Sequence, residues 1–335
     1  MNRRKIVSLL LASVVVLSVI LTGCQGSGDT NSEKVVKLQL SHQVSPKHSI
    51  NETAMKFAEL VKEKSEGTME IEIFPSGSLG TERENLEALG NGSLDMAVIA
   101  VEFYPALVEE AGVFVLPYMY DNYEHQTAVL KGEAGKMLSD MILDKTGARV
   151  LSYYPLAFRQ VVTTDKPIHT VEDIKGLKIR VPESPTYVNT FTLLGAAPTP
   201  VAWGETYTAL ETNVVSGMEN TPESMYSASM HEVVKYINIT DHISAPTTFS
   251  ISDQVFEDLT EEQKTIISEA AQEATDFGLE LTIANDTKFR EELAKNIEVI
   301  ETDKESMRNA INYDAFNVMK LESAKKLKEL IDAAR

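Results

Sequence analysis

The sequence predicts an α/β protein of two lobes, joined by crossing strands and by a long C-terminal helix. Strand and helix patterns alternate over residues 35–101, and a second alternating unit starts near Val150. From Thr260 onward the pattern is helical. One apolar face continues from Ile266 to Phe289, which is long enough for a helix that crosses both units. A chain of 335 residues also suffices for two domains with cores of their own.

The first unit has the pattern of a parallel sheet covered by helices. Residues 35–40 (VVKLQL) are β-rich, residues 49–64 carry apolar side chains at helical spacing, and residues 69–74 (MEIEIF) alternate as a strand. Residues 81–84 (TERE) form a capping box that starts a helix, and residues 94–101 (LDMAVIAV) have the composition of a buried strand. This β-α-β-α-β order indicates parallel strands.

A glycine-bearing turn at residues 75–80 (PSGSLG) joins one of these strands to a helix N-terminus, which is a place where anions can bind. The alternative is a tight turn that leads into the cap at Thr81. We favour the turn, because Glu82 and Glu84 in the first helical turn would repel a phosphate.

The second unit continues the alternation. Its strand patterns lie at residues 149–154, 159–163 and 176–181. Its helical patterns lie at residues 186–194 and 203–212, and residues 198–200 (PTP) between them are expected to form a stiff loop.

We expect lobe I to span residues 35–156, with about 246–285 returning to it, and lobe II to span residues 157–245, with about 286–335 packing on it. Two such units describe a bilobed binding protein, and they also describe many two-domain enzymes.

The N-terminus has the pattern of an export signal over residues 1–23. Three cations precede an apolar run of 16 residues, Ile6 to Leu21, which ends in small residues before Cys24. This pattern resembles the bacterial lipobox, in which the cysteine is lipidated and becomes the first residue. The alternative is a transmembrane anchor, for which the run is short. The polar residues 24–34 would then be a flexible tether.

The formal net charge of −19 argues against nucleic-acid binding, which needs a basic surface. An anion site in this chain therefore has to be a local cluster of cations. The sequence contains no GxSxG, GxxxxGK[ST] or HExxH motif, and its six histidines show no metal-ligand spacing. We expect a protein that is not an enzyme and needs no cofactor and no metal, although an exported enzyme acting on organic acids stays open.

Two arginines lie in or beside apolar strand patterns of the second unit. Arg180 precedes the strand-ending Pro182, and Arg159 opens the strand before it. A guanidinium pairs bidentately with a carboxylate, so two converging arginines suit a carboxylate ligand. The alternative is that each arginine pairs with an internal acid, for which Glu183, Glu172 and Glu205 are available.

The region around these arginines resembles a known family. It contains RQVVTTDKPI, then DIKGLKIRVPES, then LGAAPTPVAWGETYTALETNVVSGMENTP. These motifs resemble the substrate-binding subunit of tripartite ATP-independent periplasmic (TRAP) transporters, the family of the C4-dicarboxylate and sialic acid receptors. GSLGTERENLEALGNGSLDMAV and VFVLPYMYDNYEH extend the resemblance over most of the chain after the signal.

The resemblance implies a periplasmic-binding-protein-like fold and a set of ligand-binding residues. Arg180 would make the bidentate salt bridge to the ligand carboxylate, and Arg159 and Asn220 would assist it. The other residues implied to line the pocket are Trp203, Glu183, Glu82, and His42 or Gln43.

The resemblance also implies how such a protein works. It would be a lipid-anchored, extracytoplasmic monomer that closes on a small organic acid and delivers it to two TRAP membrane subunits. A sensor that reports to a membrane kinase is an alternative. Because Glu183 and Glu82 accept hydrogen bonds when ionised, we favour a hydroxylated sugar acid, a uronate or an aldonate, over a C4-dicarboxylate. Glu183 turned outward would weaken this preference.

Overall fold

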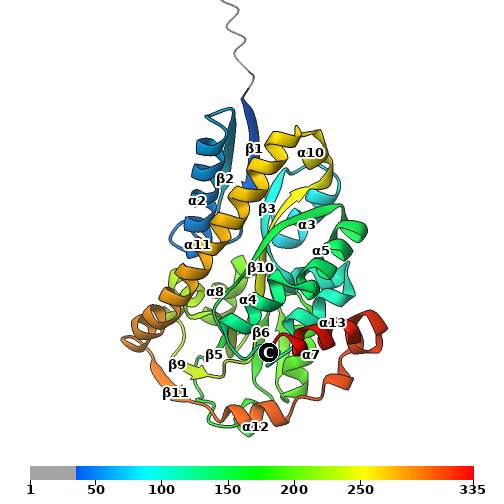
Figure 1. Cartoon of the computed structure of the whole chain (residues 1–335). Helices are drawn as coiled ribbons and strands as arrows, with labels where there is room; N and C mark the ends of the chain where they lie inside the picture. Colours follow the sequence, from blue (N-terminus) through cyan, green and yellow to red (C-terminus); the bar gives the residue numbers. More distant parts are fainter. Residues whose placement is uncertain (1–34) are drawn as a thin grey trace, which may run out of the picture. The chain divides into compact units, whose positions relative to one another are not determined.

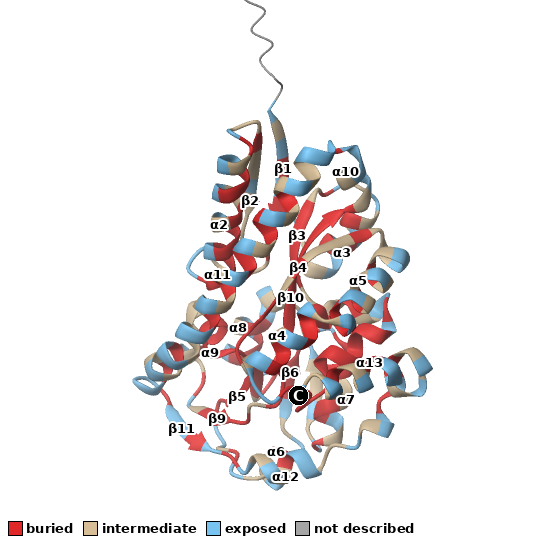
Figure 2. Ribbon diagram, in the orientation of Figure 1, coloured by how far each residue is buried: buried red, intermediate tan, exposed pale blue. Residues whose placement is uncertain are grey.

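The computed structural model describes residues 35–335, so the predicted signal peptide, Cys24 and the tether lie outside the described residues (Figure 1). Within residues 35–335 no helix is both long enough and apolar enough to cross a membrane. The described chain forms two sheets with helices around them, the bilobed α/β fold that the sequence predicts. Buried strands run through the interior and exposed helical faces lie outside them (Figure 2).

The first sheet has five strands. Their spatial order is β2 (Met69–Phe74), β1 (Val36–Ser41), β3 (Met96–Ala100), β10 (Pro246–Ser252) and β4 (Ala148–Pro155). β1 pairs in parallel with β2 and β3, which confirms the predicted parallel arrangement. β10 runs antiparallel between β3 and β4 because it enters from the other sheet.

Helices flank this sheet and supply its core. They are α2 (Ser49–Lys64), α3 (Glu82–Gly90), α4 (Tyr123–Lys131), α5 (Glu133–Thr146) and α10 (Asp253–Asp258). Phe57 of α2 meets Phe249 of β10 edge to face, with ring centroids 5.5 Å apart. The predicted capping box is present, since Thr81 accepts from the Glu84 amide and the Glu84 carboxylate accepts from the Thr81 amide.

The second sheet has six strands. Their order is β11 (Glu298–Glu301), β9 (Tyr236–Ile239), β5 (Gln160–Thr163), β8 (Gly217–Asn220), β6 (Lys178–Val181) and β7 (Ala197–Pro200). The expectation of a loop at residues 198–200 was wrong, because this segment is β7, paired in parallel with β6. An edge strand tolerates two prolines, since its outer side needs no amide donors.

Short helices connect these strands. The α-helices are α6 (Val171–Ile174), α7 (Pro185–Leu193), α8 (Thr206–Glu211), α9 (Pro222–Ser227) and α12 (Lys304–Asn309). The 3₁₀ helices are η1 (Val101–Ala106), η2 (Glu109–Val115), η3 (Trp203–Glu205), η4 (Met230–Glu232), η5 (Tyr313–Ala315) and η6 (Asn317–Lys320).

The chain passes between the two sheets three times. Residues 156–159 lead from β4 to β5, residues 240–245 lead from β9 back to β10, and α11 (Glu261–Ala294) leads from the first sheet to β11. The 34-residue α11 contacts α2 and β4 of the first sheet and α9 of the second (Figure 1). The last helix, α13 (Glu322–Ala333), packs on α5 and η2, which precede the first crossing. The exact lobe boundaries stay a prediction.

Candidate ligand-binding site

Arg180 is a buried cation on β6, an inner strand of the second sheet, and only 2% of its surface is exposed. Its Nε and Nη2 both donate to the Val201 carbonyl oxygen, at 2.9 and 2.7 Å, and its guanidinium carbon lies 5.7 Å from the centre of the Trp203 ring. Among residues 35–335 it forms no ion pair within 4.0 Å. Burial lowers the pKa of Arg180 to about 10.

Arg159, by contrast, is saturated by internal acids. Its Nε and Nη2 donate to the two Glu219 carboxylate oxygens at 2.5 and 2.8 Å, and its Nη1 donates to Glu102 at 3.3 Å. His242 Nε2 lies 3.3 Å from the same Glu219 carboxylate. Burial is the largest single effect and would raise the pKa of Glu219, but the Arg159 charge and the hydrogen bonds from His242 and Arg159 together lower it to about 2. The alternative of internal pairing therefore applies to Arg159, through acids that were not among those considered.

Arg180, Arg159 and Glu219 form a cluster with two acids from the first sheet's side, Glu102 and Glu82, and we call these five residues the arginine cluster. Glu102, on η1 directly after β3, is buried, and its second oxygen accepts from the Tyr187 hydroxyl at 3.3 Å. Glu82, half-buried at the start of α3, accepts from the Ala100 amide at 3.2 Å. Burial and then the Glu102 charge raise the pKa of Glu82 to about 8, and burial also raises the pKa of Glu102. Glu82 is thus largely a neutral acid at pH 7, able to donate one hydrogen bond and accept others.

Asn220 lies at the end of an inner strand of the second sheet, and Trp203 lies in the short helix that follows the edge strand β7. Asn220 ends β8, the neighbour of both β5 and β6, and its Oδ1 accepts from the Thr221 amide at 2.8 Å. This leaves the two amide hydrogens of its side chain for another acceptor. Trp203, at the start of η3, is half-buried.

The two candidates at the end of β1 are engaged within the first sheet's unit. His42 is buried, and its Nε2 lies 3.1 Å from Asn51 Oδ1, while its Nδ1 has no partner among the described residues. Burial lowers the pKa of His42 to about 4, so the ring is neutral at pH 7. The Gln43 amide donates to the Gly80 carbonyl at 2.5 Å, which holds the turn before α3. This contact agrees with our interpretation of residues 75–80 as a turn.

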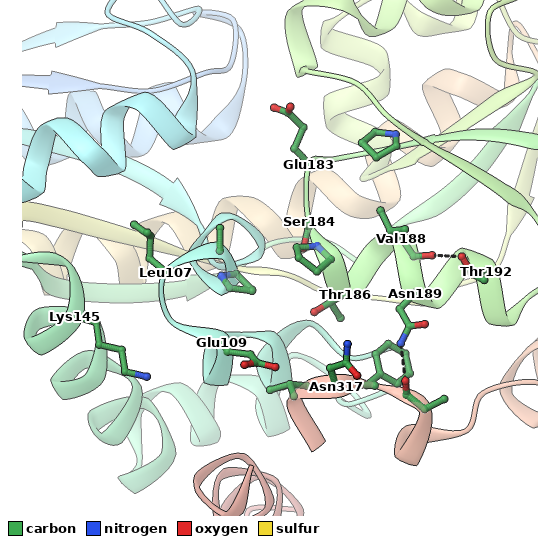
Figure 3. Close-up of a pocket in the computed structure, with 17 residues that line it drawn as sticks. Leu107, Glu109, Lys145, Glu183, Ser184, Thr186, Val188, Asn189, Thr192 and Asn317 are labelled. Carbon is green, nitrogen blue, oxygen red and sulfur yellow. Dashed lines mark hydrogen bonds between the residues drawn. The ribbon is translucent and has the colours of Figure 1, made fainter. Parts of the chain in front are cut away.

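Glu183 is exposed and lines a cavity of about 890 Å³. The cavity lies between η1 and η2 on one side and α7 on the other, with residues 315–318 closing it (Figure 3). The Glu183 carboxylate points away from Ser184 and Thr186 (Figure 3). Of the eight predicted binding residues only Glu183 lines this cavity. Ser184 also lines it, is 1% exposed, and its hydroxyl has no partner among the described residues.

Three polar residues of this region were missed by sequence reasoning. Glu102 follows an apolar strand run as its first charge, a signal equivalent to the one that drew attention to Arg180. Glu219 directly precedes Asn220, and an acid there can pair with the arginine that immediately precedes the adjacent strand β5. Ser184 carries no sequence signal.

Comparison with known proteins identifies the family of this chain. A family model described as bacterial extracellular solute-binding protein, family 7, matches residues 40–319. The chain belongs to this family. This confirms the predicted receptor class, since the family 7 proteins are solute-binding receptors, and the solved relatives are TRAP periplasmic solute-binding proteins.

Relatives of this family 7 receptor bind more than one kind of acid. The C4-dicarboxylate-binding protein DctB of Bacillus subtilis (strain 168) is 33% identical over 78% of this chain and 74% of its own. The sugar acid binding protein DctPAm of Advenella mimigardefordensis, solved with galactonate, has a TM-score of 0.85 at 27% identity, covering 90% of this chain and 99% of that one. A TRAP solute-binding protein of Chromohalobacter salexigens, solved with D-glucuronate, has a TM-score of 0.85 at 27% identity, covering 89% and 100%.

Proposed function

We propose that this family 7 receptor binds the carboxylate of a hydroxylated organic acid on Arg180 and delivers the acid to a TRAP-type transporter. The observation that carries the proposal is the buried Arg180 guanidinium, which lacks an anionic partner among the described residues. Burying an unpaired charge is costly, so an anionic ligand there has a large favourable interaction to gain. Asn220 would donate its free amide hydrogens to the same carboxylate, and Trp203 would wall the site.

The other groups of the cluster favour hydroxyl groups over a second carboxylate. Glu102 and Glu82 lie near Arg180, since both act on its pKa against the larger effect of burial, and both can accept from hydroxyls. A second ligand carboxylate would find acids and no free cation there among residues 35–335, whereas hydroxyl groups can hydrogen-bond to these acids whether they are neutral or ionised. The galactonate and D-glucuronate complexes of the two relatives support a uronate or aldonate, whereas the Bacillus subtilis relative keeps a C4-dicarboxylate as the second candidate.

Competition calorimetry tests this preference. We expect D-glucuronate or D-galactonate to bind at least tenfold more tightly than succinate, with each acid recovered chemically unchanged. Tighter binding of succinate would contradict the sugar-acid assignment while leaving the receptor function intact. Chemical conversion of the acid would instead indicate an enzyme.

The mode of action includes closure. The carboxylate would dock on the second sheet's side, and Glu82 and Glu102 from the first sheet's side would engage the ligand when the lobes approach. A smaller radius of gyration in X-ray scattering at saturating ligand is the expected result, and an unchanged radius would contradict closure.

We propose a monomer, anchored outside the cytoplasm by a lipid on Cys24, that docks on two TRAP membrane subunits. Mass spectrometry of the membrane fraction should find a diacylglyceryl-modified Cys24 as the first residue. Release of the Cys24→Ser variant into the soluble fraction should accompany loss of that modification, and an unmodified wild-type Cys24 would contradict the anchor.

A further inference from the structure

A buried carboxylate that contacts neither arginine of the site joins three elements, α9, α2 and α11. Glu223, in the first turn of α9, is 5% exposed. Its Oε1 accepts from the Ser49 backbone amide at 2.9 Å and from the Asn285 side-chain amide at 3.0 Å, and its Oε2 accepts from the Ser49 hydroxyl at 2.6 Å. Hydrogen bonds to a buried carboxylate are about twice as strong as those between neutral groups.

A second contact runs beside the first. His48, the N-cap of α2, accepts from the Ile50 amide through Nδ1, so its Nε2 carries the proton in the neutral ring. That Nε2 donates to the Ser224 hydroxyl at 3.0 Å, and the Thr221 hydroxyl contacts the same Ser224 oxygen at 2.9 Å. His48 and Ser224 are both buried, which shields the pair of contacts from water.

These contacts connect the two sheets rather than parts of one. Ser49 is the first residue of α2, whose apolar face packs in the core of the first sheet. Glu223 lies three residues after Asn220, the end of β8 in the second sheet. Asn285 belongs to α11, the helix that contacts both α2 and α9. The positive end of the α2 dipole also faces the Glu223 carboxylate.

We infer that Glu223 is a positioning residue for closure. It fixes the N-terminus of α2 against the first turn of α9 and so holds the segment of Asn220 in register with the first sheet's side. Separation of the sheets would break both Ser49 contacts and return a carboxylate and an amide to water. The contact therefore favours the closed arrangement and slows ligand release without touching the ligand.

The inference predicts a change in closure and in ligand dissociation. In Glu223→Ala we expect affinity for D-galactonate to fall about tenfold to a hundredfold, mostly through a faster dissociation rate. Glu223→Gln keeps one acceptor oxygen and should give an intermediate loss. Ser49→Ala, which removes only the hydroxyl donor, provides a milder variant should Glu223→Ala not fold. Glu124→Ala is the matched control, because Glu124 is an exposed first-turn glutamate of α4.

The experiment measures the closed population directly. Spin labels at Met55→Cys on α2 and Val214→Cys after α8, both exposed, in a chain with Cys24→Ser, report the distance between the two sides. Distances are recorded without ligand and at graded D-galactonate, with the melting temperature of each variant alongside. We expect a smaller short-distance population in Glu223→Ala and Ser49→Ala than in wild type and Glu124→Ala, at every concentration where wild type populates it.

The measurements with ligand rest on the proposed receptor function, and the possible results distinguish a failure of this inference from a failure of that function. Loss of melting temperature with unchanged distances and dissociation rate would overturn the inference and reduce Glu223 to a structural role. Failure of wild type to bind any sugar acid or dicarboxylate would overturn the receptor proposal. In that case the ligand-free distances alone would test the role of Glu223 in closure. Equal distance distributions in wild type and Glu223→Ala would overturn this role, and a distribution shifted to longer distances in Glu223→Ala would support it.

Discussion

At the residue scale, the two arginines of the site differ in what surrounds them. Arg159 has Glu219 and Glu102 as partners, whereas Arg180 has the carbonyl of Val201 and the ring of Trp203. A carbonyl dipole and an aromatic face stabilise a cation less than a carboxylate does. The proposed carboxylate contact would therefore change the energy of Arg180 more than that of Arg159, which already has acidic partners.

This difference predicts the effect of Arg180→Ala. We expect affinity for D-galactonate to fall at least tenfold to a hundredfold, as about two charge-assisted hydrogen bonds are lost. The ligand-free melting temperature should fall much less than the loss of affinity suggests, because the variant also removes a buried unpaired charge that is costly to the folded state. Isothermal calorimetry and thermal unfolding are the measurements. Arg83→Ala, which removes an exposed arginine paired to Glu87, is the control, and equal affinities in the two variants would contradict the assignment.

Glu82 predicts a pH dependence of stability. Its pKa is raised to about 8, above the value of about 4.5 for a free glutamate, so between these pH values the folded chain holds a proton that the unfolded chain has lost. The stabilisation from Glu82 is complete below pH 4.5 and is lost as pH rises through 8. Glu82→Gln stays neutral and should gain melting temperature relative to wild type as pH rises from 6 to 9. A difference that is constant over this range would contradict the raised pKa.

At the element scale, local sequence patterns are enough to predict individual helices and strands, but they do not predict which strands pair in a sheet. The alternation in MEIEIF and the capping box at Thr81 predict β2 and α3 because neighbours in sequence determine both. The insertion of β10 between β3 and β4, and the edge position of β7, depend on residues far apart in the chain. The site shows the same limit: the family motifs selected Arg180 and Asn220, but only the packing shows that Glu219 and Glu102 neutralise Arg159.

The close packing of α11 on the first sheet predicts the outcome of a glycine substitution. A Cβ at Gly278 would lie 2.8 Å from Thr53 Oγ1 and 3.2 Å from a Tyr154 ring carbon. Alanine is about 1 kcal/mol better than glycine in a helix interior, yet we expect Gly278→Ala to reduce the free energy of unfolding by roughly 1–3 kcal/mol through overpacking. Denaturant unfolding measures it.

The partner variant Thr53→Ala provides the control. Removing the threonine hydroxyl and methyl takes away the two nearest obstacles to a new Cβ. In the double variant the loss should be smaller than the sum of the single losses, by about 0.5 kcal/mol or more. Additive losses would show that Thr53 does not resist the new methyl group.

At the scale of the whole molecule, the net charge is negative, whereas the proposed anion site at Arg180 is positive. The chain has 50 acidic residues against 31 lysines and arginines, a formal net charge of −19. Near the site, Glu219 offsets the charge of Arg159, and Glu183 is exposed beside the cavity. On the proposed function, an approaching sugar-acid anion would be repelled at long range by the net charge and attracted at short range by Arg180.

This balance predicts how salt changes the association rate. The Debye length falls from about 30 Å at 0.01 M to about 8 Å at 0.15 M ionic strength, which screens the net charge before it screens the buried arginine. We expect the association rate constant for D-galactonate to rise with KCl over this range, whereas an electrostatically steered receptor would show a fall. Stopped-flow recording of Trp203 fluorescence is the measurement, with the dissociation rate constant changing less because the bound carboxylate is shielded from solvent. An association rate that decreases with salt would show that the positive field of Arg180 reaches beyond its buried site and outweighs the acidic surface.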